Sequence, residues 1–149
     1  MYRTVIAASI SLAGLLLGGC SSMGTAQLRS AEGRLAPCDD APHCVSSQDA
    51  IPARRIDAIA YTGTREGAQQ LLSHIVKGME GAEIVSETPG YIHAIYTSKL
   101  LHFVDDLELQ FPPQKWVDVR SSSRTGYYDL DANRNRVEAI RKAFNDRQP

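Results

Sequence analysis

The stretch YIHAIYTSKLLHFVDDLELQF, residues 91–111, decides the fold of this chain. It is rich in β-branched and aromatic residues, which favour strands, and Ser98-Lys99 divides it into two runs. A further run of the same character lies on each side, beyond Pro89-Gly90 and Pro112-Pro113. Turn signals between short strand patterns are typical of an antiparallel meander. The sequence predicts four strands in succession, over residues 84–87, 91–98, 101–111 and 115–121.

The third strand pattern places Asp105 among apolar side chains, because side chains alternate between the two faces of a strand. One face collects Phe103, Asp105, Leu107, Leu109 and Phe111, and the other collects His102, Val104, Asp106, Glu108 and Gln110. A polar group that points with an apolar face must find a partner, so Asp105 is expected to form a buried ion pair. The candidate partners are Arg120 and Arg124, which are also candidates for Asp129. Asp106 points to the other face, which is wrong for two carboxylates that act together as acid and base.

Two helices are expected, one before and one after the meander. The first covers residues 65–81, with Thr64 as its cap and Gly81 as its end. The second covers residues 132–147 behind a capping Asp131. Apolar side chains recur every three or four residues in both, which predicts a buried stripe on each helix. These stripes consist of Ala68, Leu71, Leu72, Ile75, Val76 and Met79 in the first helix and of Val137, Ile140 and Phe144 in the second.

The remaining segments complete the fold prediction. A short strand pattern at residues 56–60 precedes the first helix, while residues 35–54 hold three prolines and are expected to be irregular. The order strand, helix, four strands, helix predicts the α+β class. We expect a two-layer domain, with an antiparallel meander of about four to five strands and two helices packed on one face.

The first twenty residues have the pattern of a bacterial lipoprotein precursor. Arg3 precedes an uncharged apolar run, residues 5–17, that is shorter than the roughly 20 residues of a membrane-spanning helix. The run ends in Leu17-Gly18-Gly19-Cys20, which resembles the lipobox before which signal peptidase II cuts. We therefore expect a signal peptide over residues 1–19 and a permanent lipid anchor on Cys20.

The lipoprotein pattern also predicts the domain boundaries and the cellular location of the protein. Residues 20–34 are polar and lack apolar periodicity, which is typical of a tether, and residues 35–149 suffice for one hydrophobic core. Ser21, and not Asp, follows the lipidated cysteine, which in the enterobacterial sorting rule favours the outer membrane. We expect a single α+β domain in the bacterial cell envelope, held by its lipid and facing the periplasm.

Cys38 and Cys44 remain after Cys20 is lipidated. An even pair of cysteines in an oxidising compartment predicts a disulfide. Two other states are possible: free thiols, or a metal cluster with Asp39, Asp40 and His43, although zinc sites usually have tighter Cys-x-x-Cys spacing. The sequence therefore predicts no metal and no cofactor.

The charge of the chain excludes one class of partner. Its formal net charge is −1 and becomes −2 when Arg3 is removed with the signal peptide. There is no basic field of the kind that attracts nucleic acid, so nucleic acid is not an expected partner.

Polar side chains gather near the last connection between strand and helix. The predicted cluster consists of Asp105, Arg120, Ser121, Ser123, Arg124, Asp129, Asn133 and Arg134. Guanidinium groups and backbone amides near a helix start suit an anion such as phosphate, sulfate or carboxylate. The other interpretation is structural, with the arginines paired to aspartates. A calcium loop is excluded, because Arg134 occupies the glycine position and Ile140 the position of the bidentate glutamate.

Two classes of function remain open. The first is a non-catalytic envelope module that binds a partner protein, the membrane surface or a small anionic ligand. The second is a small hydrolase or transferase that uses the arginine and aspartate cluster. Catalysis by a serine has little support, because Ser121, Ser122 and Ser123 lack a glycine-flanked elbow. His74, His93 and His102 show no triad order either, and His74 is expected at the surface.

Three separated motifs resemble one family. They are LAPC followed by CVSSQ at residues 35–38 and 44–48, FVDDLE at residues 103–108, and RSSSRTGYYDLDANRNRVE at residues 120–138. Together they are similar to the bacterial and plastid family known as domain of unknown function 1499, over roughly residues 35–147. The resemblance implies a shared fold and no particular reaction. The chain departs from the family at Asp39, where proline is frequent, and at Leu130-Asp131, where glycine is common.

Overall fold

The computed structural model describes Leu28 and residues 33–149. The predicted signal peptide, Cys20 and most of the predicted tether lie outside the described residues. In the described part of the chain, no helix is long and apolar enough to cross a membrane.

A six-stranded antiparallel sheet forms one layer of the domain. Its path runs β1-β6-β5-β4-β3, and β2 pairs with β6 off this path. The strands are β1 (Cys44–Ser46), β2 (Ile59–Ala60), β3 (Ala82–Thr88), β4 (Tyr91–Thr97), β5 (Val104–Gln110) and β6 (Trp116–Ser123). The predicted meander is confirmed for β3 to β6, because each pairs with the next strand in the chain.

Two expectations about the strands are wrong. Strand β1 lies in the segment that was expected to be irregular, because it pairs with β6 far away in the chain and local sequence does not report that pairing. The third strand begins at Val104 and not at residue 101. Residues before it form a turn in which Ser98 N donates to the Phe103 carbonyl at 2.9 Å. Phe103 is consequently half exposed instead of packed with Leu107.

Two helices form the second layer, α1 (Arg65–Lys77) and α2 (Ala132–Asn145). Thr64 caps α1 as predicted, since its Oγ1 accepts the Gly67 N–H at 3.0 Å. Helix α1 ends at Lys77 with Gly78 as its C-cap, and not at Gly81, which is the last residue before β3 and has φ +73°. A Cβ on Gly81 would lie 2.6 Å from the Thr97 carbonyl oxygen, so this position requires glycine.

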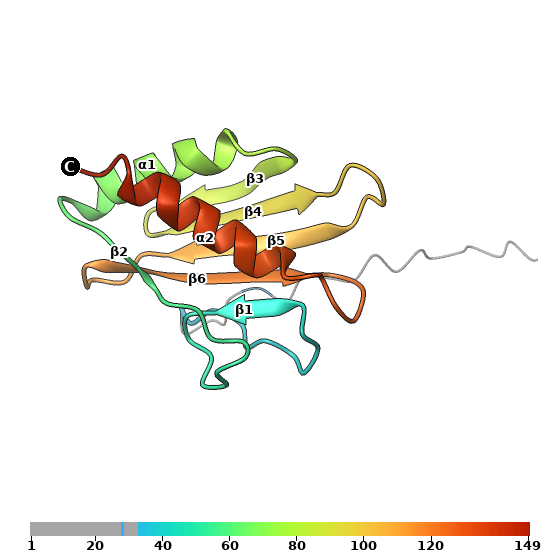
Figure 1. The fold of residues 1–149 in the computed structure, drawn as a ribbon. Coiled ribbons are helices and arrows are strands. Elements are labelled where there is room, and N and C mark those ends of the chain that lie inside the picture. The colour runs from blue at the N-terminus through green and yellow to red at the C-terminus, as the bar shows by residue number, and fades with distance from the viewer. Residues whose placement is uncertain (1–27, 29–32) are drawn as a thin grey trace, which may run out of the picture.

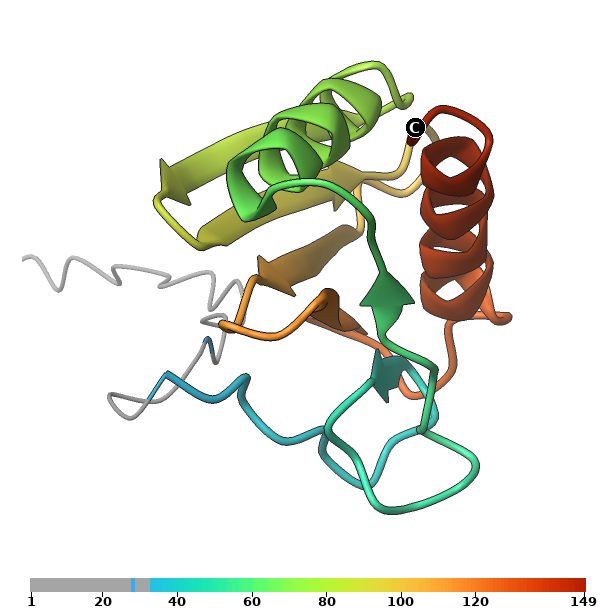
Figure 2. The same ribbon diagram turned by 90° about the vertical axis from the view of Figure 1, so that its left-hand side faces the viewer.

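The core lies between the helices and one face of the sheet. Figures 1 and 2 show both helices on that face, and the chain that leads from residue 33 to β1 on the opposite side. The predicted stripes pack here, with Leu71 and Met79 at the margin. Their most deeply buried members are Leu72, Val76, Val137, Ile140 and Phe144.

Candidate functional site

The eight residues of the predicted cluster are divided between the two faces of the sheet and its β1 edge, and Asp129 contacts both the helix side and the edge. Successive residues of β6 point to opposite faces of the sheet, so Arg120 lies on the helix-free face while Ser121 and Ser123 face α2. Asp105 and Asn133 join the serines on the helix side. Arg124 joins Arg120 on the helix-free face, and Asp129 and Arg134 line a pocket at the β1 edge. The structure therefore brings Ser121, Ser123 and Asn133 together, with Asp129 hydrogen-bonded to Asn133 and Asp105 joined to them through Arg136. It places Arg120, Arg124 and Arg134 elsewhere.

On the helix side, Asp105 forms the buried ion pair that its position predicted, but with a different arginine. Arg136 Nη2 of α2 donates to Asp105 Oδ2 at 2.6 Å, whereas Arg120 and Arg124 belong to the other face. The Arg136 guanidinium also stacks on Tyr96, 4.3 Å from the ring centroid. Burial raises the pKa of Tyr96 to about 12, against the opposing charge of Arg136. The pair thus fastens α2 to β5.

Asn133 is the centre of the contacts between α2, β6 and the loop that the Cys38–Cys44 disulfide closes, which we call the disulfide loop. It is fully buried, and its Oδ1 accepts from Ser121 Oγ at 2.6 Å. Its Nδ2 donates to Ser123 Oγ and to the His43 carbonyl, both at 3.0 Å. Asp129 Oδ2 accepts the backbone N–H of Asn133 at 2.9 Å. Asp131 occupies the N-cap position of α2 as predicted, but it adopts a left-handed conformation and makes no side-chain capping hydrogen bond, so Asp129 supplies the capping carboxylate.

The helix-free face of the sheet carries polar side chains that are also buried. Asp106 is 3 % exposed and accepts from Arg124 Nε at 2.8 Å and Nη2 at 2.9 Å. His93 Nε2 lies 2.7 Å from Asp106 Oδ1. Burial alone raises the pKa of Asp106, but the hydrogen bonds from Arg124 and His93 outweigh it and lower the pKa to about 2. Asp106 is therefore held as a carboxylate.

A second buried group lies beside this one, around Glu108. Tyr91 donates its hydroxyl to Glu108 Oε1 at 2.6 Å, and Arg120 Nη1 lies 3.4 Å from Oε2. Arg120 Nε is buried and has no hydrogen-bond partner among the described residues. On the same side, Gln110 donates to the Gly33 carbonyl, which brings the start of the described domain against this face.

Sequence reasoning missed the helix-free face as a buried site. The alternation in β5 correctly put Asp106 and Glu108 on the face opposite Asp105, and the strand pairing places His93 directly across from Glu108. The available signal was the spacing of the arginines: Arg120 in β6 and Arg124 just after it are four residues apart, so alternation places both on the same face as Asp106 and Glu108.

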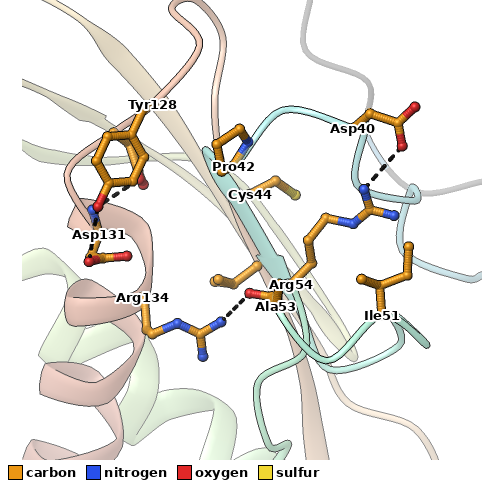
Figure 3. Close-up of a pocket in the computed structure, with 11 residues that line it drawn as sticks. Asp40, Pro42, Cys44, Ile51, Ala53, Arg54, Tyr128, Asp131 and Arg134 are labelled. Atoms are coloured by element: carbon orange, nitrogen blue, oxygen red, sulfur yellow. Dashed lines mark hydrogen bonds and ion pairs between the residues drawn. The ribbon is translucent and has the colours of Figure 1, made fainter.

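A pocket of about 270 Å³ opens at the β1 edge, beside the disulfide of Cys38 and Cys44 (Figure 3). Its residues are Asp40, Pro42, Cys44, Val45, Ile51, Ala53, Arg54, Tyr128, Asp129, Asp131 and Arg134. Arg134 donates to the carbonyls of Ala53 at 2.8 Å and Arg55 at 3.1 Å, so its charge serves to fix the neighbouring turn.

The disulfide loop is fixed to the loop that follows β6. His43, a member of the possible metal cluster, is buried, and its Nδ1 donates to the Gly126 carbonyl at 2.6 Å. Its Nε2 lies 3.2 Å from Asp39 Oδ2. Within the described residues, no group of three or more histidines, cysteines or acidic side chains could hold a metal ion.

The serines and most histidines of these places are engaged with other groups of the protein. Ser121 and Ser123 are engaged with Asn133, and Ser122 Oγ donates to the Ser123 carbonyl at 3.4 Å. His93 binds Asp106 and His43 binds Asp39, and no hydrogen bond joins the side chain of any of the three serines to a histidine side chain in the described part of the chain. His74 is exposed, as predicted.

The fold and the polar sites define a small α+β domain with an antiparallel sheet, two helices and a pocket at the sheet edge beside a disulfide. The chain belongs to the family described as protein of unknown function (DUF1499), whose family model matches residues 34–144. The resemblance carried by the sequence motifs is thereby confirmed. No curated protein and no solved structure matches the chain.

Proposed function

We propose that this chain is a lipid-anchored bacterial envelope protein whose domain is a non-catalytic binding module. The observation that supports a non-catalytic domain is that the charged side chains named in the sequence analysis are bound to other groups of the protein. Asp105, Arg124 and Arg134 are bound to Arg136, Asp106 and backbone carbonyls respectively. Side chains that are bound in this way hold parts of the fold together, whereas acid and base catalysis requires side chains that are free to exchange protons with a substrate.

The alternative, a hydrolase or transferase, has less support. Its best candidate is the hydrogen-bonded group of His93, Asp106 and Arg124, in which Asp106 orients His93 as a carboxylate orients a general base. His93 and Asp106 are buried and Arg124 is partly buried, however, and none of the three lines the pocket at the β1 edge.

The pocket at the β1 edge is the best-supported binding site. Three carboxylates line it, Asp40, Asp129 and Asp131, against the guanidiniums of Arg54 and Arg134. The arginines donate to protein oxygens, so the pocket favours a ligand group with positive charge or N–H donors, such as a lysine side chain of a partner protein. A small anion is the competing ligand.

The lipid anchor is tested by Cys20→Ala in the intact precursor. Without the thiol there is no acceptor for the diacylglyceryl group, and lipoprotein processing does not proceed. We expect complete loss of labelling by a fatty-acid analogue and accumulation of the longer, uncut precursor on gels. Ser21→Ala, which keeps the thiol, serves as the matched control and should label normally. Undiminished label in Cys20→Ala would refute the anchor.

The pocket is tested by titrating the purified protein with blocked lysine, blocked glutamate and inorganic phosphate while recording backbone amide spectra. We expect blocked lysine to shift amide signals around Tyr128 and Asp131. Asp131→Asn should weaken that binding about three- to fivefold, because exposed charge pairs contribute up to about 1 kcal/mol. Asp146→Asn, remote from the pocket, should have no effect. Tighter binding of phosphate than of lysine would replace this proposal with the anion.

A further inference from the structure

Two loops at one end of the sheet expose large apolar side chains. The loop between β4 and β5 carries Leu100, Leu101 and Phe103, which are 86 %, 63 % and 50 % exposed. The loop between β6 and α2 carries Tyr127 and Leu130, which are 76 % and 78 % exposed. Isolated exposed apolar residues are ordinary, but a group of this size at one end of a small domain indicates an interaction surface.

The two loops are neighbours although they are far apart in the chain. Strand β5 begins where β6 ends, with Asp105 paired to Ser123. Arg124 N donates to the Val104 carbonyl at 3.0 Å, which ties the base of one loop to the base of the other. Figure 1 shows both loops projecting beyond the same end of the sheet. We call these five side chains, Leu100, Leu101, Phe103, Tyr127 and Leu130, the loop end.

Two residues in the loops of the loop end have strained backbone conformations. Leu130 has φ +56° and His102, between Leu101 and Phe103, has φ +52°. Side chains disfavour this left-handed region, and a leucine held there while exposed to water gains nothing from burial within the domain. Strained positions of this kind recur at binding surfaces.

We propose that the loop end docks on the lipid bilayer, with its apolar tips at the level of the headgroups. The proposal rests on the lipid anchor of Cys20 proposed above. Gly33 lies 13 residues after Cys20, which allows a reach of up to about 45 Å. Strand β5 is only about 24 Å long, so the tether permits either end of the sheet to meet the membrane. The end with apolar tips gains most from doing so.

The charges around the loop end suit a bilayer. Lys99 pairs with Glu80, and Arg124 pairs with Asp106, while the carboxylates of Asp129 and Asp131 on either side of Leu130 add negative charge. The loop end therefore suits a neutral lipid surface and not an anionic one. Tyrosine and leucine are favoured side chains at the interface between headgroups and acyl chains. Separate protruding tips also suit a deformable bilayer better than a protein groove, which demands continuous complementary shape.

The test uses tryptophan as a depth probe in the full lipidated protein. Trp116 is the only tryptophan, and it lies at the start of β6, at the opposite end of the sheet. One variant carries Leu101→Trp and another Tyr127→Trp, each combined with Trp116→Phe, and the native protein serves as the control. The proteins are reconstituted in phosphatidylcholine vesicles with plain or brominated acyl chains. Thermal melting confirms that each variant is folded.

We expect Leu101→Trp and Tyr127→Trp each to lose about half of their fluorescence in brominated vesicles, because interfacial aromatic side chains sit next to the acyl chains. Trp116 should be unchanged. If Cys20 is acylated and neither introduced tryptophan is quenched, docking is overturned while the anchor stands. If Cys20 carries no acyl chain, the anchor fails. Quenching on addition of brominated vesicles would then still support docking by the loop end, and its absence would reject it.

Discussion

We expect Asp105→Ala to lower the free energy of unfolding by about 3 kcal/mol or more at neutral pH, because it leaves the Arg136 guanidinium buried without its carboxylate. Arg136 Nη2 and Asp105 Oδ2 are 2.6 Å apart, and each side chain is only 12 % exposed. The loss should appear in urea denaturation at any phosphate concentration, since the pair is internal to the fold.

Two control variants separate this cause from a general effect of losing a carboxylate. Asp146→Ala removes the partner of Lys142 in an exposed ion pair, which contributes at most about 1 kcal/mol. The double variant Asp105→Ala, Arg136→Met should regain part of the stability, because no buried charge remains in it. An Asp105→Ala protein as stable as the wild type would show that the ion pair of Asp105 and Arg136 does not stabilise the fold.

Local patterns were sufficient to predict most of the elements. The stripe that includes Leu72 and Val76 specified α1, and Thr64 specified its start, because both signals lie within one stretch of chain. The end of α1 was misplaced, since Gly78 and Gly81 are both acceptable helix stops and the choice depends on β3 pairing with β4. Strand β1 was missed for the same reason, because it is stabilised by a distant strand.

The sequence predicted which face of the sheet each aspartate of β5 occupies, but it did not predict which side chains bind them. Alternation along β5 separated Asp105 from Asp106, and the strand pairing agrees with that separation. The sequence could not show that both faces of β5 are buried, nor that Arg136 of α2 reaches Asp105 before any arginine of β6 does. Those facts depend on where the helices and the chain around Gly33 lie against the sheet.

The structure gives a physical meaning to Leu130-Asp131, where the family resemblance implied that glycine is common. Both residues have positive φ, 56° and 62°, a conformation that glycine adopts without cost. This chain therefore accepts strain in the loop before α2 in exchange for an exposed leucine and a carboxylate in the pocket at the β1 edge. The same loop thus contributes to both proposed binding surfaces.

Stability in acid should depend on Asp106 more than on an exposed carboxylate. The pKa of Asp106 falls from its usual 3.8 to about 2 in the folded protein. A lowered pKa stabilises the fold above pH 4, and this contribution is lost as the pH falls from about 4 to about 2. For this shift the contribution is about 2 kcal/mol.

Asp106→Asn is the variant that isolates this contribution, because asparagine keeps the shape and does not titrate. We expect the difference in unfolding free energy between wild type and Asp106→Asn to shrink by about 2 kcal/mol between pH 6 and pH 2, as the wild-type carboxyl becomes protonated. Urea denaturation at each pH measures it. Asp146→Asn, at an exposed ion pair, should show a nearly constant difference over the same range. A difference for Asp106→Asn that is equally constant would show that Arg124 and His93 do not hold Asp106 as a carboxylate.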